Sequence, residues 1–212
     1  MIYLILSDIH GNLPALETLL KKESGHYDGI INLGDVVNYA PWSNECVQLV
    51  ATLPGIINIS GNHEAYFING EYSNSGKISE LFFNVNFPVF TERDLITGYR
   101  DHFVLNEINF THTINNQYIF ADTITATEAD FCIGHSHRQY RNDLNQFSII
   151  NPGSVGQNRE FINIISYALY DAAENKFYFK QIPYNVDTVI REMESRKFPL
   201  ECIRYYKEKK RA

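Results

Sequence analysis

The stretch IYLILSDIHGN, residues 2–12, joins an apolar run directly to an aspartate, a histidine and a glycine. A continuous apolar run of this length is typical of a strand that is covered on both faces, as in parallel or mixed sheets. Polar side chains that follow such strands gather at the carboxyl edge of an open α/β sheet, where these sheets bind their ligands. The stretch therefore predicts an α/β fold with a functional site at Asp8 and His10.

Four later stretches have a similar make-up and also follow apolar runs. They are Gly34-Asp35-Val36-Val37, Gly61-Asn62-His63-Glu64, Thr111-His112-Thr113 and Gly134-His135-Ser136-His137. The chain has seven histidines, and five of them lie in the five stretches. The glycines allow sharp turns and a close approach of the backbone to a ligand. Together the stretches supply enough oxygen and imidazole ligands for two adjacent metal ions, an arrangement that cleaves phosphate esters.

The spacing within the stretches indicates which side chains can act together. Side chains at i and i+2 of an extended chain point the same way, so we expect Asp8 and His10 to reach one ion. By the same argument, we expect His135 and His137 to reach one cluster.

Two other stretches predict different roles for their polar side chains. Asn62 and His63 are adjacent and should diverge, so that one can bind metal while the other faces the substrate. Asp35 stands alone, and its two carboxylate oxygens would allow it to bridge two ions.

These motifs resemble those of the calcineurin-like metallophosphoesterases, of the small bacterial and archaeal kind. The matching segments are D-x-H-G-N from Asp8, G-D-V-V from Gly34, G-N-H-E from Gly61, G-H-S-H-R from Gly134 and N-P-G-S-V-G-Q from Asn151. The similarity is densest over residues 1–64 and 131–157. Two positions depart from the family pattern: Thr113 replaces a glycine, and the loop from Asn38 to Pro41 carries Asn and Ala where close relatives often have glycines.

The resemblance implies a four-layer sandwich, an α/β (α+β) fold with two mixed β-sheets face to face and helices outside. It also implies two metal-ion sites that share one carboxylate. One ion would be held by Asp8, His10, Asp35 and His137, and the other by Asp35, Asn62, His112 and His135. The family's catalytic histidine corresponds to His63.

Several residues have an alternative interpretation. His102 is a rival of His112, which we favour because it ends a strand whereas His102 precedes one. Arg138 is predicted either to steady a substrate phosphate or to pair with a surface carboxylate. Glu64 is expected in the first turn of a helix, countering its dipole, rather than in catalysis. Residues 151–157 are interpreted as a structural turn that presses on the His135–His137 loop.

The rest of the chain predicts one domain over residues 1–212. Asn12 can cap a helix that buries Leu16 and Leu19, and a second helix is expected near Pro41. Residues 65–103 read as an irregular, aromatic-rich insert, which is either a lid or, as we favour for most of its rings, a satellite hydrophobic cluster. Two strands are expected within residues 161–183, followed by a helical segment over 186–212.

Composition limits the class of protein and its partners. The hydrophobic content of 44% is ordinary for a globular protein, and the formal charge of −7 disfavours duplex nucleic acid as a partner. The first apolar run ends at Asp8, short of the ~20 residues of a membrane span, and no basic region precedes it. Scattered cysteines at positions 46, 132 and 202, without a CxxC motif, predict a cytoplasmic protein with reduced thiols.

The predicted function is hydrolysis of a small phosphate ester or nucleotide by a hydroxide that bridges two divalent ions, as a phosphodiesterase or phosphatase. We expect Mn²⁺ first, and Fe, Co²⁺, Ni²⁺ or Zn²⁺ as alternatives, because ligands without thiolate suit all of these. The alternative is a protein-binding scaffold of the same fold with a weak or inactive site. The presence of His63 and of every ligand position favours the enzyme.

Overall fold

The computed structural model describes residues 1–73, 76–123, 125–144 and 146–212. Its strands form two mixed sheets of five strands each. The first sheet has the order β10-β9-β1-β2-β3 and is built from Lys176–Pro183, Ile164–Asp171, Ile2–Leu6, Gly29–Asn32 and Ile56–Asn58. Its strands β1, β2 and β3 are parallel, while β9 and β10 form an antiparallel hairpin at one edge. This hairpin confirms the two strands that were expected within residues 161–183.

The second sheet has the order β4-β5-β6-β8-β7. Its strands are His102–Leu105, Ile108–Thr111, Asp130–Cys132, Phe147–Pro152 and Gln139–Leu144. The three central strands β5, β6 and β8 are parallel, and each edge strand pairs antiparallel with its neighbour. The ligand-bearing stretches therefore follow parallel strands in both sheets, as the apolar runs predicted.

The two sheets pack face to face around a shared hydrophobic cluster. Ile5 and Ile31 of the first sheet meet Phe110, Cys132 and Ile150 of the second. Because side chains alternate along a strand, Leu4 and Leu6 point to the other face and pack under helices. Strand β1 is therefore buried on both faces, which explains its continuous apolar sequence. The predicted class, with two mixed sheets face to face, is confirmed.

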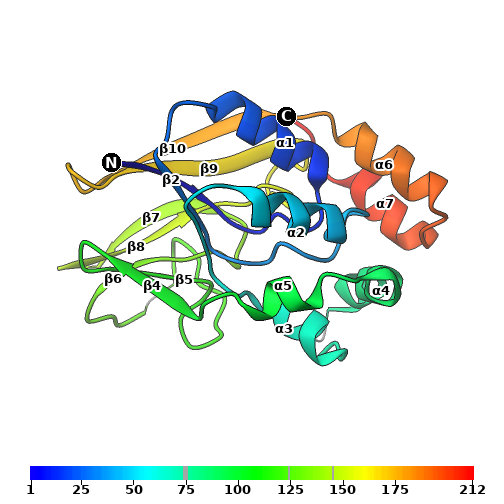
Figure 1. Cartoon of the computed structure of the whole chain (residues 1–212), viewed down its shortest axis with the longest axis horizontal. Coiled ribbons are helices and arrows are strands. Elements are labelled where there is room, and N and C mark those ends of the chain that lie inside the picture. The colour runs from blue at the N-terminus through cyan, green and yellow to red at the C-terminus, as the bar shows by residue number, and fades with distance from the viewer. Residues whose placement is uncertain (74–75, 124, 145) are drawn as a thin grey trace.

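Helices cover the outer face of the first sheet (Figure 1). They are α1 Leu13–Glu23, α2 Ser43–Thr52, α6 Val186–Ser195 and α7 Leu200–Glu208. Helix α1 begins as predicted, because the Asn12 side chain accepts a hydrogen bond from the Ala15 N–H at 3.2 Å. The C-terminal segment divides into α6 and α7 at Pro199, which precedes the first residue of α7.

The outer face of the second sheet is covered differently. Ile114 and Ile119 of the segment after β5 pack against Ile133, Tyr140 and Ile149. Within the described residues, this layer is loop rather than the helix that the family resemblance implied for it.

The prediction that residues 65–103 are irregular is wrong. The segment contains most of α3 Asn62–Asn69, then α4 Lys77–Asn86, the 3₁₀ turn η1 Phe87–Val89 and α5 Arg93–Thr97. Aromatic residues have only moderate helix propensity, so tertiary packing decides the structure here. Phe67, Phe82 and Phe83 are buried in the main hydrophobic core and not in a separate, satellite cluster.

Two further expectations can be compared with the structure. Cys46, Cys132 and Cys202 are all buried and unpaired. Among the described residues, none of the helices is both long enough and apolar enough to cross a membrane.

Candidate metal centre

The structure brings together all seven side chains that were predicted as metal ligands. Asp8 and His10 follow β1, Asp35 follows β2, and Asn62 opens α3 after β3. The second sheet contributes the three remaining histidines: His112 follows β5, and His135 and His137 lie between β6 and β7. Both aspartates and all four ligand histidines are buried, the histidines being His10, His112, His135 and His137. Two groups of possible ligand atoms result, one formed by Asp8, His10, Asp35 and His137 and one by Asp35, His112 and His135.

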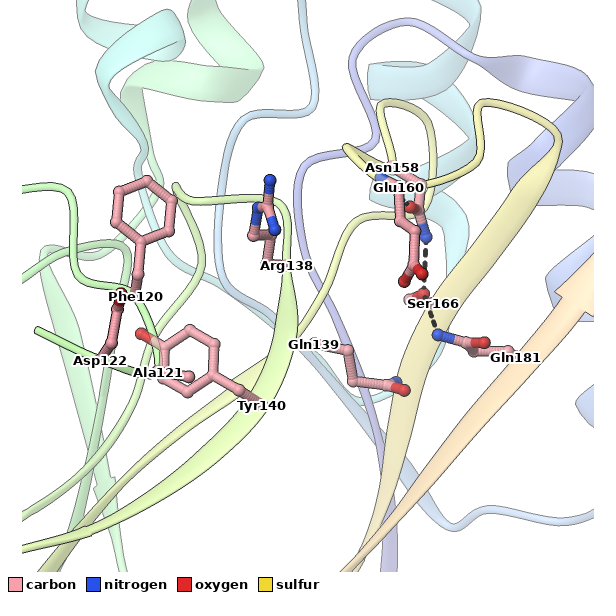
Figure 2. Close-up of a pocket in the computed structure, with 10 residues that line it drawn as sticks. All are labelled: Phe120, Ala121, Asp122, Arg138, Gln139, Tyr140, Asn158, Glu160, Ser166 and Gln181. Atoms are coloured by element: carbon pink, nitrogen blue, oxygen red, sulfur yellow. Dashed lines mark hydrogen bonds between the residues drawn. The ribbon is translucent and has the colours of Figure 1, made fainter. Parts of the chain in front are cut away.

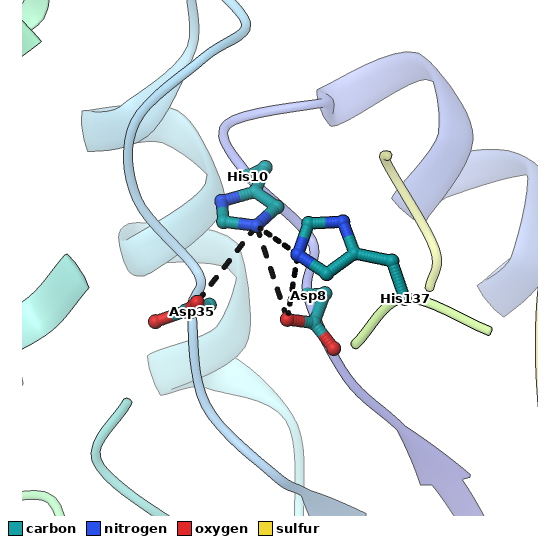
Figure 3. A group of neighbouring side chains, drawn as sticks. All are labelled: Asp8, His10, Asp35 and His137. Carbon is teal, nitrogen blue, oxygen red and sulfur yellow. Dashed lines mark hydrogen bonds and ion pairs between the residues drawn. The ribbon is translucent and has the colours of Figure 1, made fainter. Parts of the chain in front are cut away.

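The first group converges on one point (Figure 3). The Nε2 atoms of His10 and His137 lie 3.2 Å apart. His137 Nε2 is 3.3 Å from Asp8 Oδ1, and His10 Nε2 is 3.8 Å from Asp35 Oδ2. The buried Asp8 Oδ1 has no hydrogen-bond partner among the described residues.

The second group is centred on His112. Its Nε2 lies 3.2 Å from Asp35 Oδ2, 3.2 Å from His135 Nδ1 and 3.1 Å from Asn62 Oδ1. The rival His102 begins β4, is exposed and lies opposite Thr111. Thr113, which replaces the family glycine, donates a hydrogen bond to the Gln117 carbonyl at 2.7 Å. The structure thus places His112 rather than His102 beside the other ligand atoms.

The remaining ring nitrogens show why both groups suit a cation. Nδ1 of His10 is 3.1 Å from the Val37 carbonyl, Nδ1 of His112 is 2.8 Å from the Leu33 carbonyl, and Nδ1 of His137 is 2.9 Å from the Gln157 carbonyl. A carbonyl only accepts, so in each neutral ring Nδ1 carries the proton and Nε2 presents a lone pair to the centre. Imidazole nitrogens and carboxylate oxygens therefore converge on the centre, and this set of ligand atoms fits divalent metal ions.

Asp35 belongs to both groups through a single oxygen. Its Oδ2 faces His10 and His112, whereas its Oδ1 accepts the His63 backbone N–H at 2.9 Å. From the sequence, we expected both carboxylate oxygens to be available for bridging two ions. The arrangement instead offers one oxygen to both positions, because the other is used to anchor α3.

The backbone under the ligands differs from the extended chain that was assumed. Asp8, His10, Asp35, His135 and His137 have positive φ angles of 54°, 51°, 57°, 68° and 57°. Non-glycine residues rarely adopt this left-handed conformation, which costs on the order of 1–3 kcal/mol each and is concentrated at functional sites. Asp8 and His10 therefore reach one group, and His135 and His137 reach one group each, through left-handed turns and not through i, i+2 alternation.

Neighbouring residues hold these turns in place. Glu64, in the first turn of α3, accepts backbone N–H groups from Gly61 at 2.8 Å, Asp35 at 2.7 Å and Val36 at 2.7 Å. A Cβ atom at Gly61 would collide with Asp35, so only glycine permits this close approach. Glu64 lies in the first helical turn, as expected, but its main contacts are with the loop that carries Asp35.

The turn at residues 151–157 supports the other half of the centre. The Asn151 side-chain amide donates to the Gly134 carbonyl at 2.6 Å and to Ser136 Oγ at 3.0 Å. Gln157 supplies the carbonyl that fixes the His137 ring. This contact agrees with the structural role that was predicted for the segment.

Burial and charge set the protonation of the centre in the metal-free protein. Burial lowers the pKa of His10 and His137 well below the ordinary value and that of His135 to about 4, so these rings are neutral. Burial opposes protonation of His112 as well, but the adjacent Asp35 carboxylate raises its pKa to about 10. Burial likewise opposes ionisation of Asp35, yet the histidines around it, His112 first, hold its pKa well below the usual range.

The side chains of Asn62 and His63 have different partners: Asn62 Oδ1 lies beside His112, whereas the His63 ring lies 4.9 Å from the His10 ring and contacts Asn38. His63 Nδ1 lies 3.0 Å from the Asn38 amide nitrogen, which also donates to the Ser79 carbonyl at 3.1 Å. Because that amide nitrogen is a donor, His63 Nδ1 accepts and Nε2 carries the proton. The rings of Tyr66 and Tyr72 lie 5.5 and 6.1 Å from the His63 ring.

A pocket of about 550 Å³ opens onto the second group. Asn62, His112 and His135 line its floor, together with Tyr66 and Tyr118. The Tyr118 ring stacks on His135 at 3.9 Å between centroids and is half exposed. Sequence reasoning missed Tyr118, which lies in a segment without a recognisable motif.

Arg138 does not line the pocket at the second ligand group. It is exposed and lines a separate pocket of about 570 Å³. Figure 2 shows its side chain between Phe120 on one wall and Asn158 with Glu160 on the other. Arg159, which was not singled out from the sequence, neighbours Tyr39, and the Tyr39 ring lies 4.6 Å from the ring of the ligand candidate His10.

Comparisons with known proteins agree with this geometry. The family model described as the calcineurin-like phosphoesterase superfamily domain matches residues 1–175. An uncharacterized protein of Methanocaldococcus jannaschii is 28% identical over 230 residues, covering 92% of this chain and 93% of that protein.

Two solved structures share the fold over nearly their whole length. A metallophosphoesterase from Sphaerobacter thermophilus is 24% identical, with a TM-score of 0.79 and 98% of each chain covered. A hypothetical protein from Pyrococcus horikoshii is 17% identical, with a TM-score of 0.77 and 97% of each chain covered. Since the family model matches most of the sequence, the chain belongs to the calcineurin-like phosphoesterase superfamily.

Proposed function

We propose that the protein is a phosphoesterase that hydrolyses small phosphate esters with two divalent metal ions, Mn²⁺ first among the candidates. One ion would be held by Asp8, His10, Asp35 and His137, and the other by Asp35, Asn62, His112 and His135. When bound, such ions polarise phosphoryl oxygens and lower the pKa of a water to near neutrality. The observation that carries the proposal is the convergence of buried carboxylate oxygens and imidazole nitrogens in two groups that share Asp35 Oδ2.

In this proposal, His63 acts on the leaving group. Its Nε2 carries the proton, because Asn38 donates to Nδ1. The backbone N–H of His63 is bound to Asp35 Oδ1, so the ring is tied to the bridging carboxylate without being a ligand itself. A hydrogen bond from Nε2 to the departing oxygen would stabilise its developing charge.

The pocket of about 550 Å³ supports a small substrate. Tyr66 and Tyr118 flank Asn62, His112 and His135 in its lining, so an aromatic leaving group can lie against a ring while its phosphate reaches the centre. Tyr66 of α3 and Tyr72 of the loop after α3 lie close to the His63 ring, and we propose that this part of residues 65–103 shapes the leaving-group side of the site.

The test is a comparison of metal-loaded and metal-free protein on a panel of phosphate esters. We expect turnover of at least one ester with Mn²⁺, its loss after chelation and its recovery on reloading. A protein that binds metal, turns over none of the esters and co-purifies stoichiometrically with another protein would instead support the scaffold alternative.

A further inference from the structure

Arg159 is a partly buried cation without an anionic partner. Its Nη1 donates to the Tyr205 hydroxyl at 2.9 Å, and the Tyr39 hydroxyl is its other side-chain neighbour. None of the exposed ion pairs formed by Arg or Lys among the described residues includes Arg159. A guanidinium surrounded by neutral phenols is costly to desolvate unless an anion joins it.

The guanidinium lies beside the candidate metal centre. The Tyr39 ring is 4.6 Å from the His10 ring and 6.1 Å from the Tyr205 ring, so Tyr39 connects the centre to the neighbours of Arg159. After burial, the charge of Arg159 is the largest influence that lowers the pKa of His137. The same charge also acts on His63, which was assigned to the leaving group.

A second cation stands behind Arg159. The Lys209 ammonium lies 4.5 Å from the centre of the Tyr205 ring. Burial and the charge of Arg159 lower the pKa of Lys209 to about 8. We call Arg159, Lys209, Tyr39 and Tyr205 the basic corner. It comprises two like charges and two neutral phenols, and the described carboxylates form no ion pair with either cation.

The positive charge of the basic corner suits phosphate monoesters better than diesters, because the two classes differ in negative charge. A monoester is a dianion with three non-bridging oxygens at neutral pH, whereas a diester is a monoanion with two. If ions held by the centre take up two such oxygens, a third oxygen is left for a protein side chain only on a monoester. A guanidinium fork is suited to such an oxygen because it donates charge-assisted hydrogen bonds in a fixed plane.

We propose that Arg159, supported by Lys209, binds a terminal oxygen of the substrate phosphate, so that the protein prefers phosphate monoesters to diesters. This inference rests on the proposed function. It assigns the phosphate contact to Arg159 in place of Arg138, which faces a different pocket.

The first test measures binding of inorganic phosphate to the metal-loaded protein by calorimetry, without turnover. Arg159→Gln should weaken phosphate binding by about 10- to 100-fold, as expected for loss of a charge-assisted hydrogen bond. The phosphate affinity of Arg159→Lys should lie between those of the wild type and Arg159→Gln, because lysine keeps the positive charge but lacks the two parallel N–H donors of a guanidinium. Arg191→Gln, on the exposed face of α6, is the matched control and should not change the affinity.

The second test compares p-nitrophenyl phosphate with bis(p-nitrophenyl) phosphate, which have the same leaving group. Arg159→Gln should lower kcat/KM for the monoester by about 10- to 100-fold and leave that for the diester within about threefold. Unfolding temperature and metal content of each variant show that the site is intact.

Three results would overturn the inference: unchanged phosphate affinity in Arg159→Gln, equal losses on both esters, or a monoester loss in Arg138→Gln alone. If the metal-loaded wild-type protein hydrolyses none of the esters on the panel, the proposed function fails. The phosphate titration then still decides whether Arg159 binds phosphate.

Discussion

At His10 and His137, two imidazole nitrogens face each other at 3.2 Å, and the other nitrogen of each ring is committed to a backbone carbonyl. Neither ring can donate to the other while both are neutral. Opposed lone pairs in a buried site are unfavourable without a cation between them. The individual side chains therefore already indicate a metal centre, before any comparison with relatives.

His112 leads to a prediction on pH. Its pKa is raised to about 10 in the metal-free protein, and the pKa of Asp8 is raised by burial to about 7. At about pH 8, Asp8 is mostly ionised but His112 still holds a proton, which a metal ion must displace. Metal binding should release about one proton there, and affinity should rise with pH up to about 10.

Calorimetry in buffers of different ionisation enthalpy measures that proton. His102→Asn should leave the release unchanged, whereas His112→Asn should remove it together with the affinity for one ion. Metal binding without proton release at about pH 8 would contradict the assigned environment of His112.

A second prediction at this scale separates catalysis from metal binding. His63→Ala should keep the metal content and lower the rate by ~10²–10⁴-fold, because the leaving oxygen loses its donor. The loss should be larger for an alkyl phosphate than for a nitrophenyl ester, whose leaving group departs easily without help. Loss of metal in this variant would make His63 a ligand instead.

Asn38→Asp is the companion variant. Asn38 has a φ of 76°, which aspartate also tolerates, so the backbone can stay in place. The new carboxylate offers only acceptors to His63 Nδ1 and should reverse the tautomer. We expect the same dependence on the leaving group as in His63→Ala; a rate equal to that of the wild type would show that Asn38 does not orient His63.

At the scale of elements, the contact between α3 and the loop after β2 is the most testable. Glu64 accepts three short backbone hydrogen bonds, from Gly61, Asp35 and Val36. Glu64→Gln replaces one oxygen by a donor and leaves buried N–H groups unpaired, so unfolding free energy should fall by about 2–4 kcal/mol. Denaturation in urea measures this, with exposed Glu17→Gln as the control; equal stability of the two variants would refute the role.

The elements that could be predicted are those whose sequence pattern suffices on its own. Strands β1 and β2 are continuous apolar runs, and α1 has a capping asparagine with a proline in its first turn. Helices α3 and α4 could not be recognised, because their aromatic residues are helical only through packing against the rest of the core.

The difference between local sequence patterns and tertiary packing also explains which site residues could be predicted. The seven candidate ligands follow strands in short motifs, so local sequence identifies them. Arg159, Tyr39 and Lys209 come from three segments far apart in the chain and meet only through the packing of α7 beside the centre. The left-handed turns beneath the ligands also escaped prediction, since nothing in the sequence of a non-glycine residue signals a positive φ.

At the scale of the molecule, the centre joins the two sheets. Asp8, His10 and Asp35 extend from the first sheet, and His112 and His135 extend from the second. Bound ions should therefore stabilise the packing of the sheets, by about 2.7 kcal/mol at a metal concentration 100 times the dissociation constant. Thermal unfolding with and without chelator measures this, and an unfolding temperature unaffected by metal would argue against ions in the centre.

The most direct test of the whole account is metal analysis of the wild-type protein and Asp35→Asn after Mn²⁺ loading and removal of free metal. Asp35 Oδ2 faces both ligand groups, so the wild type should hold about two ions per chain. Asp35→Asn should hold one or fewer, because the amide provides no charged bridge. A wild-type protein that keeps a single ion and is fully active would contradict the two-metal centre.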